Sequence, residues 1–390
     1  MKHFFWPLLL LLLPLTGAAQ SLDSLLLAIE HNNKSLQALK KGNEATMQEV
    51  QAQNRLEDPT VEYSPFFQRN VKGMASSELV VSQGFDFPTL YAARNRYTRL
   101  QETVTDWQYE SARRDVLLAA KQFCLDLIYL NREKALLAER QKNADELQAL
   151  YEKRLAQGDA TLIDLNKIKM DHMAIRTEMA QNDMARATAL EGLQALNGGE
   201  PVAFSGQDYP ASAAEADLNA MRDYLLRNDA ALQAAEAAVN ASRQEVKVNR
   251  QGWIPKLELG YRRNTDQSEA SHGLLIGATI PLFSTRDKVK VARQRLAEAQ
   301  LQQEEARVQA ESALRTKFGE LQQLKRAAAA YDVELMRSSL QTLKKAIANG
   351  ELSVIEYYTE ADNVYRNLQE RLKLENQYQK ALADLLKSEL

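Results

Sequence analysis

Residues 158–165 read GDATLIDL, and residues 350–357 read GELSVIEY, so one glycine and acid pattern returns 192 positions later (350 minus 158). A second pair lies farther upstream: NNKSLQA at 32–38 matches NDAALQA at 228–234, 196 positions apart (228 minus 32). Matched landmarks in one order at nearly constant spacing predict an internal duplication. Two long copies are too few for a solenoid, so the pattern indicates pseudo-symmetry within one assembly.

The first residues predict export from the cytoplasm. Met1-Lys2-His3 is a short cationic start, residues 4–15 are mostly apolar, and residues 17–19 are small, as at a cleavage site. The apolar run is shorter than the roughly 20 residues of a membrane-spanning helix. We therefore expect residues 1–19 to be a signal peptide. The single cysteine, Cys124, allows no intrachain disulfide.

The composition predicts long helices. The chain has 390 residues, of which 26% are charged, and its net charge is −3. It contains 15 glycines and 9 prolines. Helix-forming residues dominate, as in long amphipathic helices. A net charge near zero gives no support for nucleic acid as a partner.

The few glycines and prolines divide the chain into two similar units. Residues 20–200 form the first predicted repeat, and residues 216–390 form the second, with 201–215 as the linker between them. Helical pattern covers about 21–56, 89–156 and 161–196 in the first repeat. In the second it covers about 216–251, about 285–347, and a last helix from the turn to the chain end. Turns are expected at 157–159 and at 349–351.

Each repeat also predicts one β-hairpin, at 59–88 and at 255–281. PTVEY at 59–63 matches PKLEL at 255–259, again 196 positions apart (255 minus 59), and apolar and polar residues alternate in both. The returning strands are expected at 78–87 and 274–281. Strands of about ten residues with one apolar face suit an outer-membrane barrel, although hairpins that cap soluble rods would show the same alternation. Four strands cannot close a barrel, since the smallest have about eight, so a barrel requires two or three chains.

The sequence shows no foothold for catalysis. His31, His172 and His272 lie far apart, and no spacing assembles a metal site or a nucleophile with its base. No glycine-rich phosphate loop is present. We therefore expect no enzyme activity, no metal and no cofactor, and any transport energy must come from a partner.

Taken together, these features resemble the TolC-like outer membrane factors, also called outer membrane efflux proteins. The resemblance covers nearly everything after the signal, namely helix, hairpin and two long helices, twice over. Its most specific parts are RLAQG at 154–158 with Asp164, and KAIANG at 345–350 with Glu356. Prolines also enter and leave each hairpin, at Pro59, Pro88, Pro255 and Pro281.

The resemblance implies a fold and an assembly. The fold is mainly α with β-hairpins: long antiparallel helices form a trimeric tunnel, and four strands per chain form a twelve-stranded barrel. The location is the outer membrane of a Gram-negative bacterium, with the helical domain in the periplasm. Expected partners are two further copies (a homotrimer), outer-membrane lipid, a periplasmic adaptor (membrane fusion) protein and an inner-membrane pump, with the resistance-nodulation-division type preferred.

The same resemblance implies a passive duct for metal ions or small toxic molecules. Two alternatives stay open: a duct for secreted proteins or polysaccharides, and a secreted periplasmic coiled-coil scaffold without channel activity. A soluble monomer or dimer would favour the scaffold.

The two glycine turns are implied to form the periplasmic tip of the tunnel. The residues implied to dock the adaptor there are Gly158, Gly350, Leu155 and Ile347. The residues implied as candidates for the pore constriction are Asp164, Glu356, Asp159, Glu351 and Leu352. Threefold symmetry would turn each acid into a ring of like charge, which favours cations. An ordinary acid at a helix start, stabilised by the helix dipole, explains the same residues without a pore.

The chain departs from the best-known family members at three positions of the tip. Those members have a tyrosine, an arginine and a second acid where this chain has Ile347, Leu352 and Thr359. A gate locked by tyrosine and arginine hydrogen bonds is therefore not expected here. An apolar constriction is the alternative.

Overall fold

The computed structural model describes residues 21–69, 71–210, 217–266, 269–283 and 285–390. The chain divides into two compact units. The helical unit comprises Met1–Lys34, Asp115–Ala214 and Lys317–Leu390, and the sheet unit comprises Ser35–Arg114 and Glu215–Thr316. Each unit therefore takes segments from both predicted repeats. The predicted signal peptide and part of the predicted linker (211–215) lie outside the described residues.

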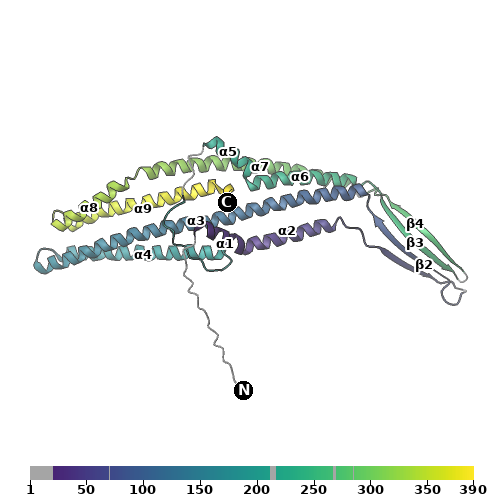
Figure 1. The fold of residues 1–390 in the computed structure, drawn as a ribbon, viewed down its shortest axis with the longest axis horizontal. Coiled ribbons are helices and arrows are strands. Elements are labelled where there is room, and N and C mark those ends of the chain that lie inside the picture. Colours follow the sequence, from purple (N-terminus) through teal and green to yellow (C-terminus); the bar gives the residue numbers. More distant parts are fainter. Residues whose placement is uncertain (1–20, 70, 211–216, 267–268, 284) are drawn as a thin grey trace, which may run out of the picture. The chain divides into compact units, whose positions relative to one another are not determined.

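The elements form two similar series along the chain, which Figure 1 colours from purple at the N-terminus to yellow at the C-terminus. The first series is α1 (Leu22–Asn32), α2 (Lys34–Ala52), β1 (Thr60–Phe66), β2 (Ser76–Phe85), α3 (Pro88–Gln157) and α4 (Leu162–Leu196). The second is α5 (Leu218–Asn228), α6 (Ala230–Gln251), β3 (Lys256–Asp266), β4 (Ala270–Thr279), α7 (Thr285–Ala329), α8 (Val333–Asn349) and α9 (Val354–Leu385), followed by a short 3₁₀ turn (Lys387–Glu389). The internal duplication is thus visible in the fold.

Two helices that the sequence predicted as continuous are each divided at an equivalent position. Asn33 separates α1 from α2, and Asp229 separates α5 from α6, 196 residues later (229 minus 33). Both residues have extended backbone, with ψ near 118° and 119°. Asp229 accepts a hydrogen bond from the Leu232 N–H at 2.9 Å, which starts α6. Asn33 donates to the Leu196 carbonyl at 2.8 Å.

The long helix expected from about 285 to 347 is also divided. It ends as α7 at Ala329 and restarts as α8 at Val333. Asp332 is the N-cap of α8, because its carboxylate accepts a hydrogen bond from the Leu335 N–H at 2.9 Å. Aspartate prefers this position to a helix interior, since its short side chain competes for backbone N–H groups. The apolar pattern had hidden this local signal.

The four strands form one antiparallel sheet in the order β1-β2-β3-β4. Val61 pairs with Val81, Val81 with Tyr261, and Tyr261 with Leu274, so one row crosses all strands. The returning strands begin before the predicted 78 and 274, at Ser76 and Ala270. The edges are β1 and β4.

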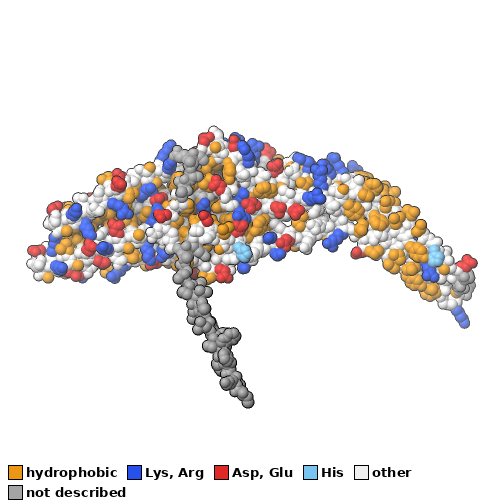
Figure 2. All heavy atoms as spheres, in the orientation of Figure 1, with side chains coloured by type: hydrophobic (Ala, Val, Ile, Leu, Met, Phe, Trp, Pro, Cys, Tyr) orange, Lys and Arg blue, Asp and Glu red, His pale blue; other side chains and the backbone are white. Residues whose placement is uncertain are grey.

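The sheet has two chemically different faces. Side chains alternate along each strand, so Val61, Val81, Tyr261 and Leu274 share one mostly apolar face. The polar side chains on this face include Gln83, Arg263 and His272. Leu274 is 86% exposed. Figure 2 shows hydrophobic side chains gathered over the strands on the face in view. A contiguous patch of exposed apolar side chains is typical of a surface that contacts a membrane or another protein.

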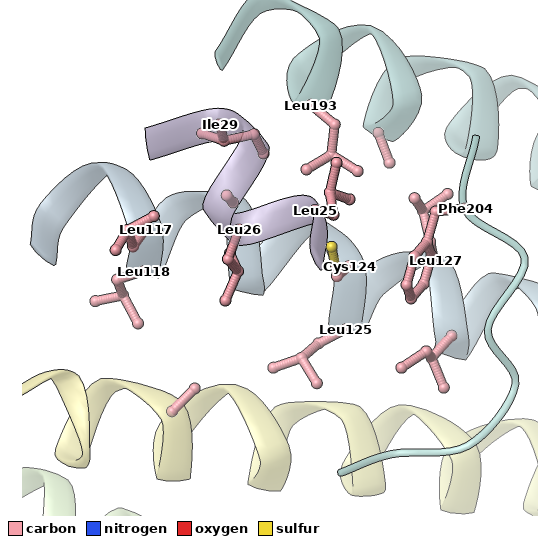
Figure 3. Packing of buried hydrophobic residues seen from close by; sticks show 14 residues of the cluster. Leu25, Leu26, Ile29, Leu117, Leu118, Cys124, Leu125, Leu127, Leu193 and Phe204 are labelled. Atoms are coloured by element: carbon pink, nitrogen blue, oxygen red, sulfur yellow. The ribbon is translucent and has the colours of Figure 1, made fainter. Parts of the chain in front are cut away.

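The helical unit contains an aliphatic core where α1, α3, α4, the linker segment and α9 meet. Leu25, Ile29, Leu127 and Leu193 are fully buried there, and Figure 3 shows them converging with Phe204. The lone cysteine, Cys124, belongs to this core, and burial raises the pKa of its thiol to about 12. Cys124 is therefore a packing residue.

Within the described ranges, no helix is both long enough and apolar enough to cross a membrane.

Candidate functional site

The first predicted turn, between α3 and α4, closes through a left-handed glycine. Gly158 has φ +84°, and its N–H donates to the Leu155 carbonyl at 3.1 Å. The Asp159 N–H donates back to the Arg154 carbonyl at 2.8 Å. A bond across five residues with glycine at positive φ is the Schellman motif that ends many helices. Glycine is needed here for its backbone freedom, because a Cβ at Gly158 would meet nothing within 4 Å.

The second turn, between α8 and α9, repeats this geometry. Gly350 has φ +75°, and its N–H donates to the Ile347 carbonyl at 3.2 Å. The Glu351 N–H donates to the Ala346 carbonyl at 2.9 Å. The duplicated sequence therefore builds the same turn twice.

Each turn is followed by the same helix start. Thr161 caps α4 and Ser353 caps α9, and both form a capping box with the acid three residues on. Asp164 accepts hydrogen bonds from the N–H and the hydroxyl of Thr161 at 3.0 and 2.7 Å. Glu356 accepts from the N–H and the hydroxyl of Ser353 at 2.9 and 2.7 Å. These bonds, the backbone one foremost, hold the pKa of Glu356 below its usual range.

Arg154 joins the two turns, although the sequence reasoning assigned it no such role. Its guanidinium donates to the Ala348 carbonyl at 2.7 Å and to the Ile347 carbonyl at 3.4 Å. The same group lies over the Tyr151 ring, 5.2 Å from its centroid. A cation at carbonyls that end a helix is favoured by the helix dipole. The two turns are therefore one connected structure.

The other residues predicted at the tip differ in exposure. Asp159 and Glu351 are exposed at the turns, while Leu155 and Leu352 are half-buried. Ile347 is 1% exposed and belongs to the core that supports the second turn. The glycine and the two acids at each turn thus lie at the surface or are partly exposed, and Ile347 is buried beneath the second turn.

Sequence reasoning missed the exposed apolar side chains beside the turns. Ile163 and Ile355 are 72% and 60% exposed, and Leu162 is similar. Ile163 and Ile355 occupy one position of the repeat (355 minus 163 is 192). That shared position was the signal available in the sequence. The repeat therefore places an exposed isoleucine at the start of both helices that follow the turns.

A buried ionic cluster around Arg140 lies farther along the same helices. The Arg140 side chain on α3 is 11% exposed and contacts Asp171 and Glu178 of α4 at 2.8 and 3.2 Å. It also contacts Asp362 of α9 at 2.9 Å. The Tyr365 ring lies 5.4 Å from the guanidinium. One cation therefore ties α3 to both α4 and α9.

The electrostatics of this cluster are set by burial. Burial alone would lower the pKa of Arg140, but the three carboxylates outweigh it and raise that pKa. Burial also raises the pKa of Asp171, against the opposing effect of Arg140. Removing one partner of such a buried pair costs far more than the pair itself contributes.

The second face of the sheet is polar, in contrast to the apolar face. It carries Glu62, Glu78, Glu258 and Arg262 among glycines and serines. Arg262 pairs with Glu78 at 2.8 Å. Among the described residues, no three His, Cys, Asp or Glu side chains gather as metal ligands would.

Long helices paired by capped glycine turns, with a four-stranded sheet that is apolar on one face, define the fold of outer-membrane channels. A membrane protein of Pseudomonas aeruginosa has this fold, with a TM-score of 0.73, 18% identity, and 94% of this chain and 93% of that one covered. For the outer membrane protein VceC of Vibrio cholerae the TM-score is 0.74 at 16% identity, with 94% of this chain and 95% of VceC covered. For the CmeC outer membrane channel of Campylobacter jejuni the TM-score is 0.75 at 15% identity, with 94% of this chain and 85% of CmeC covered.

The sequence itself matches one family model over part of the chain. Residues 221–388 match the family model described as outer membrane efflux protein. Over these residues the chain is similar to the outer membrane efflux protein family. This confirms the resemblance, the mainly helical fold with two β-hairpins, and the outer membrane as its location. The family consists of channels and not of enzymes.

The chain is also similar in sequence to a curated secretion protein. The proteases secretion protein PrtF of Dickeya chrysanthemi is 24% identical over 312 residues. The match covers 72% of this chain and 66% of PrtF, so the chain spans just under two thirds of that relative.

Proposed function

We propose that three copies of this chain form a passive export duct, in which three four-stranded sheets close one twelve-stranded barrel in the outer membrane. The helices would form the periplasmic tunnel below it. An adaptor protein and an inner-membrane pump would deliver the cargo and the energy.

The single observation that carries this proposal is the two-faced sheet with open edges. Its apolar face exposes Val61, Leu274 and Ile276, while its other face is polar. In lipid every backbone N–H and C=O needs a partner, so β1 and β4 cannot remain edges there. Pairing β1 of one copy with β4 of the next satisfies both edges. A soluble scaffold gives no reason for this apolar face.

Disulfide crosslinking tests the closure directly. Cys124 is first replaced by alanine, and Val61→Cys on β1 is combined in turn with His272→Cys, Leu274→Cys or Ile276→Cys on β4. Because β1 and β4 lie at opposite edges of one sheet, a bond between them joins different copies. We expect one of these pairs to give a covalent trimer on denaturing gels.

Val61→Cys with Gly273→Cys is the matched control. Position 273 lies on the polar face, so a cysteine introduced there points away from the side chain at position 61. A water-soluble monomer, or equal crosslinking of control and test pairs, would contradict the closed barrel.

The two connected turns are the proposed adaptor-docking tip. Gly158 and Gly350 shape the turns, Leu155 and the buried Ile347 support them, and the exposed Ile163 and Ile355 provide apolar contact. We expect the double variant Ile163→Ser/Ile355→Ser to lose copurification with the proposed periplasmic adaptor. Met184→Ser, another exposed apolar change on α4, is the control and should retain it.

The acids at the tip are the proposed constriction. Asp164 and Glu356 stay in their capping boxes in this arrangement, and Asp159, Glu351 and Leu352 lie beside them. Rings of carboxylates favour cations in a narrow pore. Glu356→Gln is expected to lower the cation preference of single channels in planar bilayers. An unchanged reversal potential under a salt gradient would place Glu356 outside the pore.

For the cargo we propose metal ions or small toxic molecules. The polar face of the sheet supports this, because its acids outnumber its bases and would give a lumen that favours cations. Deletion of the gene should then raise sensitivity to such compounds.

The similarity to PrtF favours a second candidate, a duct for secreted proteins. The same deletion strain separates the two. Loss of proteins from the culture medium with unchanged toxicity of small compounds would support secretion, and the reverse result would support efflux.

A further inference from the structure

A groove in the helical unit lies between α3 and α9, beside the first residues of α8 (Val333 and Arg337). Its volume is about 360 Å³, within the range of roughly 300–1,000 Å³ of small-molecule sites. Leu136 of α3, with Leu368 and Leu372 of α9, provides an apolar floor. Leu136 and Leu368 are buried, so this floor is part of the core. The turns and the Arg154 contact lie outside this lining.

Guanidinium groups surround this floor. Arg132, Arg337 and Arg371 line the groove, with Glu139 and Glu375 as the lining carboxylates. Glu375 is shared by two of the cations, at 3.2 Å from Arg132 and 3.3 Å from Arg371. Arg132 reaches outward to Asp208 as well. The lining therefore carries more positive than negative charge.

Arg337 is the cation least engaged by the protein. Its ion pair with Glu139 measures 3.9 Å, beyond hydrogen-bond distance, and its side chain is 61% exposed. A guanidinium has five N–H donors and binds carboxylates or sulfates through two of them at once. Arg337 and Arg371 thus offer donors directly beside an apolar floor.

We propose that this groove binds a single-chain anionic amphiphile, an alkyl chain with a carboxylate head. The chain would lie on Leu136, Leu368 and Leu372, and the head would accept hydrogen bonds from Arg337 and Arg371. Neither half of the groove alone selects such a ligand. A neutral alkyl chain leaves the arginines unused, and a small anion leaves the apolar floor wet.

Dodecanoate is the probe that tests this site. The full-length protein is reconstituted in lipid nanodiscs and titrated calorimetrically, with empty nanodiscs subtracted. We expect one saturable site per chain, and an affinity that rises roughly fourfold for each methylene added from octanoate to dodecanoate. Dodecanol, of equal chain length without the charge, should bind at least about tenfold more weakly.

Two variants attack the site by different routes. Arg337→Gln/Arg371→Gln removes the cations and should weaken dodecanoate binding by about tenfold for each guanidinium lost. Ala135→Trp fills the groove from its exposed α3 wall without changing any charge, and should abolish binding. Arg366→Gln, an exposed arginine of the same helix α9 outside the lining, is the matched control and should bind as the unaltered chain does.

The proposal fails if dodecanoate only partitions into the lipid, without saturation, or if dodecanol binds equally well. It also fails if the Arg337/Arg371 variant or the Ala135 variant binds as tightly as the control. Circular dichroism of each variant, compared with the control, identifies any that do not fold. Channel conductance is a separate readout, so failure here leaves the export duct untouched.

Discussion

The two glycine turns match each other, whereas the Arg140 cluster occurs at one copy of the repeat. The repeat offset of 192 places Asp332 at the position of Arg140 (140 plus 192) and Asn363 at that of Asp171 (171 plus 192). Asp332 starts a helix where Arg140 sits inside one. The duplicated parts are local backbone structures. The unduplicated parts connect the two copies.

Arg154 follows the same rule as Arg140. Its position in the second copy is Ala346 (154 plus 192), whose side chain carries no charge. Arg154 bonds to carbonyls of the other turn, and Arg140 pairs with Asp362 of α9. The two copies thus contain similar helix pairs, and Arg140 and Arg154, which have no equivalent in the second copy, connect them. We call the Arg140 and Arg154 contacts the joints between the two copies. Removing a joint should affect the stability of the molecule differently from altering a turn.

The largest effect is expected for Arg140→Met. The change leaves Asp171, whose side chain is 5% exposed, without its cation, and unpairing a buried charge costs about 3–5 kcal/mol. Asp362→Asn should cost less than about 1 kcal/mol, because Asp362 is one-third exposed and Arg140 keeps its two partners on α4. Chemical unfolding followed by circular dichroism measures both. An equal loss of unfolding free energy in the two variants would contradict the difference in burial between Asp171 and Asp362.

The two turns should respond alike to loss of their glycines. Gly158→Ala and Gly350→Ala each force alanine to positive φ, at about 1–2 kcal/mol. The control is Gly319→Ala inside α7, where a Cβ meets nothing within 4 Å and alanine favours helix by about 1 kcal/mol. Unfolding midpoints of the three variants give the comparison. A neutral effect at one turn and not at the other would show that the two turns are not equivalent.

The turns were predictable because their signals are local. A glycine that ends a helix, followed by Thr161 or Ser353 with an acid three residues on, is a sequence signature of a Schellman turn and a capping box. Alternation likewise predicted the hairpins. The break at Asp332 carried such a signal too, but the surrounding apolar pattern suggested an uninterrupted helix.

The joints between the copies could not be read in the same way. Arg140 stands among other charged residues of a helix, and sequence alone does not tell a buried arginine from a solvated one. Its role depends on Asp171 and Asp362, which lie 31 and 222 positions away in the chain. Ile347 shows the same limit, since its burial beneath the second turn depends on packing across helices.

Loss of the other joint should have a smaller effect. Arg154→Gln removes the bonds to the Ile347 and Ala348 carbonyls, which are worth about 1 kcal/mol together at a partly exposed site. Hydrogen exchange should show faster opening of the second turn with the first turn less affected, since the lost acceptors belong to the second. Lys153→Gln, an exposed neighbour, is the control. Equal acceleration at both turns would argue for general destabilisation.

The smallest expected effect is a difference in acid sensitivity. The pKa of Glu356 is lowered by its capping bonds, so its contribution to stability is present above the unfolded pKa of about 4.3 and is lost as the pH falls through the folded value. The pKa of Asp171 is shifted in the opposite direction, so its effect on stability has the opposite dependence on pH. Its pKa is raised by burial, so the folded state holds that proton more tightly, and the resulting stabilisation fades as the pH rises. Unfolding between about pH 3 and pH 6 should therefore show a shallower acid-induced loss in Glu356→Gln and a steeper one in Asp171→Asn. Parallel curves for both variants would mean that neither carboxylate titrates differently on folding, and the distinction between an exposed cap and a buried joint would lose its electrostatic basis.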